Sequence, residues 1–378
     1  MPGDTRHVVT VGGAGGVAIS THGGRRLLTL RGHGNPAHAI RFLGGGELIV
    51  TFGRDGARVW RIHEKIRLAH TDRIFGLCFD DSRRLVTSSM DGWVRIWGFW
   101  GSGIRPLHEH DFGKPVYSVA AVSGGEQIIA GLKDGSICVW TPATGEVDRR
   151  QLHRGRIWSI LIQPTPERQI LTCGSHGEAH LWTEDLVHLE DLSQNTSELR
   201  FGAWSRDGSR FAIPGMSGSV FLGQGRQLLP VPGLESGYWS VCFDPLGEQL
   251  LTGSVTGKTQ LWTLDGQTVR TFDDHGVTVD SAVFSADGDH VLTASKDGTT
   301  RLWRSSDRKL VFELADTVGQ VTRAIFSPDG MWIVTAVGSG LIRYWPASAV
   351  ELRKTLEGLE LRGFTRRELM QYGELFPK

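Results

Sequence analysis

The chain has 378 residues, of which 41 are basic, 41 are acidic and 50 are glycine. This composition is typical of a folded chain with many turns, and it excludes an intrinsically disordered or collagen-like protein. Because the formal net charge is zero, no overall field attracts nucleic acid or anionic lipid, so binding of either would need a local basic patch.

Membrane and secretion signals are not found in the sequence. No part of it approaches the roughly 20 consecutive apolar residues that a membrane-spanning helix needs. The first six residues, Met1 to Arg6, lack the basic and apolar regions of a signal peptide. We therefore expect a cytoplasmic protein with no membrane partner.

The first predicted element is a hairpin within residues 1–26. Residues 7–20 contain two short apolar runs on either side of a glycine-rich stretch between Val11 and Val17. A dinucleotide-binding loop would need a helix directly after these glycines, and the sequence there predicts a strand. The stretch therefore predicts a hairpin turn.

A repeat begins after this hairpin and continues to residue 346. Seven similar phrases end in tryptophan, and an eighth has Gly223 in the tryptophan position. These eight positions are spaced by about 41 residues on average, which is typical of a repeat architecture. The seven tryptophans are Trp60, Trp97, Trp140, Trp182, Trp262, Trp303 and Trp345.

Each repeat predicts three short strands joined by tight turns. In residues 279–304, for example, apolar residues alternate with polar ones in three runs, which are separated by Ser-Ala-Asp-Gly and Lys-Asp-Gly. Alternation with a period of two indicates strands, and Asp-Gly pairs favour turns because glycine accepts a positive φ. The repeats are therefore antiparallel hairpins in series.

These repeats resemble the WD-repeat family of β-propellers over nearly all of residues 27–346. Members of this family carry a His before the first strand, a Ser or Thr in the second, an Asp in the next turn and a Trp in the third. The resemblance implies that these side chains form hydrogen-bonded sets, which a buried indole and imidazole require. Three repeats have all four: His33, Thr51, Asp55 and Trp60; His70, Thr87, Asp91 and Trp97; and His275, Thr293, Asp297 and Trp303.

Other repeats depart from this pattern. His153, Thr172 and Trp182 occur with His176 in place of the Asp, and another repeat has Ala130 in place of the hydroxyl residue. The repeat that ends at Gly223 has almost none of the set, so we expect its blade to be the least protected against local opening.

The predicted fold is an all-β, single WD-repeat β-propeller with eight blades over residues 27–346. The strand at residues 26–30 is expected to complete the last blade and close the ring. The sequence leaves two alternatives open: nine blades, of which residues 1–26 form a partial one, or seven, which is the commonest number in the family. In an eight-bladed ring, residues 1–26 would be an appendage.

Residues 347–378 predict a short C-terminal helix. Thr365 and Glu368 have the spacing of a capping box, in which each side chain bonds the backbone of the other. This tail also resembles the one that follows WD-repeat regions in bacterial signal-transducing NTPase and kinase proteins. The resemblance implies a bacterial sensor or regulatory module.

No enzyme motif is found, and we predict no catalytic residue, cofactor or metal site. The sequence contains no GxxxxGK[ST], HExxH or GxSxG motif. The four cysteines show no Cys-x-x-Cys spacing, which favours small buried core residues over metal ligands or disulfides. They are Cys78, Cys138, Cys173 and Cys242.

The resemblance places one group of residues at an end of the ring, where partners of WD-repeat propellers often dock. Aromatic side chains interleaved with arginine and lysine are typical of interface hot spots. The alternative is that the aromatics plug the channel, and for Trp158 and Trp239 the two hypotheses are evenly matched. The predicted partner-binding residues are Arg73, Phe75, Tyr117, Lys133, Arg156, Trp158, Arg200, Trp239 and Lys296.

The sequence thus favours a non-catalytic platform for protein–protein interaction, whose site suits an acidic or aromatic-bearing peptide. Two alternatives come from other classes. One is an enzyme with its active site at the channel mouth. The other is a nucleic-acid binder that uses Arg73, Lys133 and Arg156, and its affinity would fall steeply with salt.

Overall fold

A computed structural model describes residues 67–347 apart from short gaps at 101–102, 123–124, 167, 195–197, 235, 273–274 and 317–318. In residues 1–66 it describes the backbone of six strands, and residues 348–378 are not described. Side chains are described from Ala69 onward, with a few further gaps.

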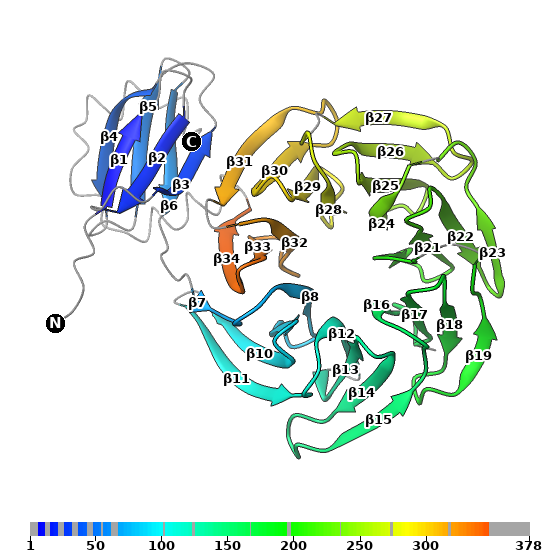
Figure 1. The fold of residues 1–378 in the computed structure, drawn as a ribbon. Helices are drawn as coiled ribbons and strands as arrows, with labels where there is room; N and C mark the ends of the chain where they lie inside the picture. Colours follow the sequence, from blue (N-terminus) through cyan, green and yellow to red (C-terminus); the bar gives the residue numbers. More distant parts are fainter. Residues whose placement is uncertain are drawn as a thin grey trace.

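Seven antiparallel sheets are arranged in a ring around a common axis in Figure 1, and a cavity lies along their inner strands. Six of these blades run from an inner to an outer strand in chain order. Their strands are β8 (Ile74–Phe79), β9 (Leu85–Ser89), β10 (Trp93–Trp100) and β11 (Gly103–Asp111); β12 (Val116–Val122), β13 (Gln127–Leu132), β14 (Ser136–Trp140) and β15 (Val147–Gln151); β16 (Ile157–Ile162), β17 (Ile170–Gly174), β18 (Ala179–Trp182) and β19 (His188–Asp191); β20 (Ala203–Trp204), β21 (Arg210–Pro214), β22 (Val220–Gln224) and β23 (Gln227–Pro230); β24 (Tyr238–Phe243), β25 (Gln249–Ser254), β26 (Thr259–Thr263) and β27 (Thr268–Phe272); and β28 (Val279–Phe284), β29 (His290–Ser295), β30 (Thr299–Arg304) and β31 (Leu310–Asp316).

The seventh blade closes the ring with strands from both ends of the described chain. It contains β32 (Val321–Phe326), β33 (Trp332–Val337) and β34 (Leu341–Pro346), and its outer strand is β7 (Arg67–Leu68). Two residue pairs, Leu341 with Leu68 and Ile342 with Arg67, align β34 with β7. The closing strand is therefore not the one at residues 26–30 that the sequence predicted.

The N-terminal strands lie outside the ring. β1 (His7–Val11), β2 (Gly16–Thr21) and β3 (Arg26–Arg31) form an antiparallel ribbon, and β3 pairs with β31, the outer strand of its blade. β4 (Ala37–Leu43), β5 (Leu48–Gly53) and β6 (Gly56–Arg61) form a separate three-stranded sheet. These strands stand beside the seven blades in Figure 1.

The prediction of eight blades is therefore wrong, because the ring closes with seven. Its blades use residues 67–346, whereas the prediction also placed residues 27–61 in the ring. The repeat that ends at Trp60 does form three strands, as its pattern predicts. Local alternation specifies a sheet, but it does not specify which sheets pack around one channel.

The predicted C-terminal helix is not found, since all elements that the structure describes are strands. Thr365 and Glu368, on which that prediction depended, lie outside the described residues.

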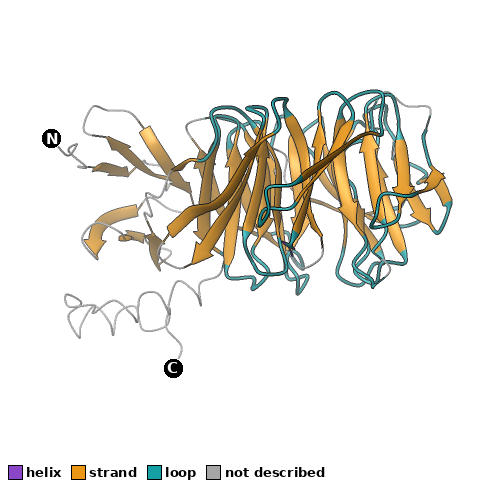
Figure 2. Ribbon diagram, turned by 90° about the horizontal axis from the view of Figure 1, so that it is seen from below, coloured by secondary structure: helices purple, strands orange, loops and turns teal. Residues whose placement is uncertain are grey.

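Apolar clusters between neighbouring blades form the core. Trp97, for example, packs with Ile74 and Leu85 of its own blade and with Val334 and Ile342 of the closing blade. Similar clusters lie at the other blade contacts. Figure 2 views the ring from its edge, with loops gathered at its two ends.

Candidate functional site

A β-bulge near the start of the inner strands positions the candidate site. In β8, Ile74 pairs with Ser89 and Gly76 pairs with Ser88, so Phe75 between them has no partner across the strands. A bulge of this kind re-aims the extra side chain and increases the local twist. The same irregularity recurs at Tyr117, Trp158, Trp239, Asp280 and Thr322, and also at His38 of the separate N-terminal sheet.

The bulged aromatics form one cluster at the centre of the ring. The Phe75 and Tyr117 rings stack with their centroids 5.1 Å apart, and Trp158 meets Tyr117 edge-on at 4.9 Å. Phe201 and Trp239 approach Trp158 at 6.0 Å and 5.9 Å. Phe75, Tyr117, Trp158 and Phe201 are buried, and Trp239 is partly exposed. Four of these rings thus close one end of the channel, and Trp239 reaches the surface there.

The predicted partner-binding residues therefore differ in how accessible they are. Phe75, Tyr117 and Trp158 are 3–6% exposed, which leaves a docked partner little ring surface to contact. Phe201 was not predicted: in this repeat, which has almost none of the family motif, the sequence analysis selected the neighbouring Arg200. A sequence signal for Phe201 was present, because the apolar residues Leu199 and Phe201 alternate with Arg200.

Basic side chains cover this aromatic cluster. The Arg200 guanidinium carbon lies 3.5 Å from the Trp158 ring centroid and 4.1 Å from that of Trp239. Arg156 lies 4.6 Å from the Tyr117 ring centroid and 4.7 Å from that of Trp158. Because the face of an aromatic ring attracts cations, these stacks hold both guanidinium groups in place.

Three further cations surround the cluster. The Lys296 Nζ lies 4.3 Å from the Trp239 ring centroid, and the Arg323 guanidinium lies 3.2 Å from that of Phe201. Arg73 lies at a longer 5.9 Å from Phe75. Arg323 was not among the predicted residues, and it also donates from Nε to the Phe75 carbonyl at 3.0 Å.

Lys133 lies in the turn between β13 and β14 and is exposed. Its backbone N–H donates to the Pro115 carbonyl, and no contact with the aromatic cluster is found for its side chain among the described residues. The structure therefore brings eight of the nine predicted partner-binding residues together and leaves Lys133 apart.

Two carboxylates balance part of this positive charge. Glu198 contacts both Arg200 and Arg156, with 3.7 Å between its Oε1 and Arg156 Nη1. Asp280 is 3% exposed and lies 3.8 Å from Lys296 Nζ. Burial raises the pKa of Asp280 to about 6, although Lys296, Arg323, Arg200 and Arg73 act against this rise.

Burial also acts on the arginines. It lowers the pKa of Arg200 to about 10 and that of Arg323 to about 9, while the neighbouring carboxylates oppose the change. Both guanidinium groups nevertheless stay protonated at neutral pH. We call the set of Arg73, Arg156, Arg200, Lys296, Arg323, Glu198, Asp280 and Trp239 the ring mouth.

A cavity of about 250 Å³ continues from the aromatic cluster along the inner strands of all seven blades. Trp158, Phe201 and Arg323 line its end at the ring mouth, and Cys78 and Cys242 line its wall. Burial raises the pKa of both thiols to about 12, so they are protonated and unreactive at neutral pH.

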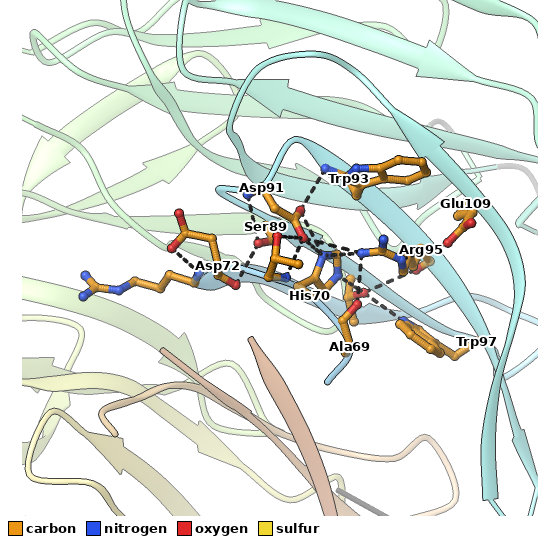
Figure 3. Close-up of polar contacts among 12 residues, drawn as sticks. Ala69, His70, Asp72, Ser89, Asp91, Trp93, Arg95, Trp97 and Glu109 are labelled. Atoms are coloured by element: carbon orange, nitrogen blue, oxygen red, sulfur yellow. Dashed lines mark hydrogen bonds and ion pairs between the residues drawn. The ribbon is translucent and has the colours of Figure 1, made fainter. Parts of the chain in front are cut away.

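The β8–β11 blade shows how the hydrogen-bonded sets are built. The Thr87 hydroxyl lies 2.8 Å from His70 Nε2 and accepts from the Trp97 indole N–H at 2.8 Å, and Asp91 lies 3.0 Å from His70 Nδ1. Figure 3 shows this network, which also includes Arg95. With Asp91 accepting from Nδ1–H, the other ring nitrogen accepts the Thr87 hydroxyl proton.

Of the two other predicted sets, one forms the same contacts and one lies outside the described side chains. In the β28–β31 blade, His275 contacts Thr293 at 2.7 Å and Asp297 at 3.0 Å, and Trp303 donates to Thr293 at 3.1 Å. The set of His33, Thr51, Asp55 and Trp60 lies outside the described side chains.

In the β16–β19 blade, a carboxylate that the sequence did not indicate lies beside the histidine. His153 contacts Thr172 at 2.8 Å, and Trp182 donates to the same hydroxyl at 2.9 Å. Glu178, rather than His176, lies 3.2 Å from His153 Nδ1, but the two groups are not oriented for a hydrogen bond. The longer glutamate side chain reaches the imidazole from two positions further along the turn.

No metal site emerges from the described part of the molecule, where no three His, Cys, Asp or Glu side chains gather closely enough to hold an ion. Nor does any described segment form a helix with the length and hydrophobicity of a membrane crossing.

Comparison with known proteins identifies WD40 repeats in the chain. The family model described as "WD domain, G-beta repeat" matches residues 63–98, 101–141, 266–304 and 308–346. Human Echinoderm microtubule-associated protein-like 2 is 31% identical over 155 residues, which cover 39% of this chain and 23% of that protein. Telomerase protein component 1 of Rattus norvegicus is 26% identical over 260 residues, which cover 62% of this chain and 10% of that protein.

A third relative, Target of rapamycin complex subunit wat1 of Schizosaccharomyces pombe, is 25% identical over 183 residues, covering 44% of this chain and 57% of that protein. The chain thus spans less than a quarter of the length of the first two relatives.

Proposed function

We propose that the protein is a non-catalytic platform that binds a protein partner at the ring mouth. The observation that carries this proposal is the group of cations held over an aromatic floor by stacking. Arg200 and Arg156 share Trp158, and Lys296 covers the partly exposed Trp239. Tryptophan and arginine in such an arrangement are typical of residues that dominate protein interfaces.

The rest of the site supports a binding role. Buried rings close the channel beneath the cations, so a partner would meet a firm surface that needs little rearrangement on binding. Within the mouth, Glu198 and Asp280 each face cations. One relative is by its name a subunit of a complex, which is consistent with an interaction platform.

A narrower role as a bacterial sensor or regulatory module, acting in the cytoplasm, is a further part of this proposal. It rests on the resemblance of residues 347–378 to the tails of bacterial signalling proteins. In such a role the ring would recognise the partner, and a separate effector would carry the signal.

Partner capture from the native host tests the proposed function. The tagged protein is compared with an Arg73→Glu/Lys133→Glu variant, which reverses two charges at this end of the ring. Loss of partners with the variant is expected, because like charges placed in an interface cost binding energy. A matched control is Arg226→Glu, whose side chain is 72% exposed on the outer part of another blade.

Equal capture by the wild type and the double variant would contradict docking at this end. Capture of nucleic acid instead of protein, with affinity that falls steeply as salt increases, would favour the nucleic-acid alternative.

A further inference from the structure

The ring mouth contains buried hydrogen-bond donors that the chain itself does not use. Among the described residues, Arg200 Nε and Nη1 have no acceptor, nor do Arg156 Nε and the Trp158 indole N–H. The Arg200 side chain is 7% exposed, and Trp158 is 3% exposed. Leaving a buried donor without an acceptor is costly, and more so for a charged group.

These donors lie close to one another. Arg200 stacks on Trp158 at 3.5 Å, and Arg156 stacks on the same ring at 4.7 Å. The unused donors of three side chains therefore belong to one compact cluster, which draws on the β16–β19 blade and the segment that leads into β20.

The charge of this cluster is also unbalanced. Among the side chains that the structure describes, five cations and two carboxylates, Glu198 and Asp280, make up the ring mouth. Although the chain is formally neutral, positive charge is concentrated at the ring mouth, where aromatic rings exclude water. Attraction for an anion is stronger in such a place than at an exposed surface, because solvent screens it less.

Glu198 indicates which anion fits. One oxygen of its carboxylate contacts Arg200, and the other lies 3.7 Å from Arg156. The spacing of the two arginines therefore already accommodates one carboxylate. The remaining donors, Arg200 Nε and Nη1 and Arg156 Nε, are of the type that binds a second one, since guanidinium groups form strong charge-assisted bonds with carboxylates.

We propose that Arg200 and Arg156 bind an aspartate or glutamate side chain of the protein partner, over the Trp158 ring. This proposal rests on the proposed function, because it takes the occupant of the ring mouth to be a protein. It adds the chemistry of recognition: the partner presents an acidic residue, and the aromatic floor limits how deeply that residue enters.

Two peptides that differ only in charge test the proposal. Acetyl-(Gly-Glu)5-amide and acetyl-(Gly-Gln)5-amide are titrated into the full chain at low salt by calorimetry. We expect the glutamate peptide to bind and the glutamine peptide to bind far more weakly. Arg200→Gln should weaken the glutamate peptide about tenfold or more, since it removes a charge-assisted contact.

Arg226→Gln is the matched control and should leave the affinity unchanged, because Arg226 lies away from the ring mouth. Two further variants keep the test decisive if Arg200→Gln fails to fold. Arg156→Gln changes a side chain that is 29% exposed and should also weaken binding. Asp280→Asn removes a negative charge from the ring mouth and should strengthen it.

Equal affinity for the two peptides, or glutamate affinity that Arg200→Gln and Arg156→Gln leave unchanged, would overturn the proposal. Competition by inorganic phosphate at concentrations where acetate does not compete would also overturn it, in favour of a phosphorylated partner. Partner capture that depends on Arg73 and Lys133 without glutamate binding would refute the carboxylate site alone. Glutamate binding without partner capture would refute the proposed function alone.

Discussion

The β8–β11 blade and the β20–β23 blade differ in the residue that fills the tryptophan position of the third strand. In the first, Thr87 links the His70 imidazole and the Trp97 indole inside the blade. In the second, Gly223 stands where the tryptophan would be, and the Phe211 ring fills that space, packed edge-on against Trp204.

The difference shows that a blade needs a filled core rather than a particular set of hydrogen bonds. A large indole carries a polar N–H, and burying it requires an acceptor, which Thr87 supplies. Phe211 fills comparable space with no polar atom, so its blade needs neither the threonine nor the histidine. The hydrogen-bonded set is one solution to the burial of tryptophan.

The largest expected effect comes from Thr87→Val. The substitution keeps the shape of a fully buried side chain and removes the oxygen that His70 and Trp97 both contact. We expect a loss of about 3 kcal/mol in the free energy of unfolding, because two buried polar groups lose their partner. Urea denaturation measures it, with the exposed Thr268→Val as the control. A loss no larger than that of the control would show that the network contributes little.

Gly223→Ala tests the other blade. A Cβ at Gly223 would lie 2.1 Å from the Phe211 ring, so the ring must move. We expect a loss of about 2 kcal/mol from this overpacking. Gly98→Ala is the matched control, because its Cβ would meet Leu107 at an ordinary 3.5 Å. Equal stability of the two variants would mean that Phe211 does not fill the tryptophan space tightly.

Asp91→Asn gives a smaller effect that depends on pH. Burial alone would raise the pKa of Asp91, but hydrogen bonds from His70 and from backbone N–H groups hold it well below its ordinary value. A lowered carboxyl pKa stabilises the fold above the unfolded pKa, and this contribution is lost as the pH falls through the folded value. The variant should therefore lose about 1 kcal/mol at pH 7 and show a flatter decline in stability below pH 4.

Denaturation of the wild type and the variant at pH 7 and at pH 3 measures this difference. Asp185→Asn, at an exposed turn, is the control. An unchanged acid response of Asp91→Asn would indicate that the carboxylate is not stabilised by its partners in the folded state.

The smallest expected difference concerns local opening. The inner strand of the β20–β23 blade pairs with β21 at only two positions, whereas β8 pairs with β9 at five. Amide hydrogens of β20 and β21 should therefore exchange faster than those of β8 and β9. Hydrogen exchange read by mass spectrometry checks this, and equal protection in the two blades would contradict it.

The candidate site was only partly readable from the sequence. The sequence pattern located the four bulged aromatic residues, Phe75, Tyr117, Trp158 and Trp239, because each inner strand begins with the same local pattern. Phe201, Arg323 and Glu178 were missed, since their roles come from neighbours far away in the chain or from the reach of a longer side chain. Whether the aromatic rings bind a partner or close the channel also depended on contacts between different blades.

The amino-acid sequence by itself determined the strands, their tight turns and the β-propeller class, because alternation, Asp-Gly turns and the tryptophan period are local properties. Only the tertiary structure decided that seven blades form the ring, that Arg67 and Leu68 complete the last one, and that strands β1 to β6 stand outside it. The physical reason is that every repeat can form a sheet. Ring closure depends instead on how the inner strands pack around one channel and on which edge is left for the final strand.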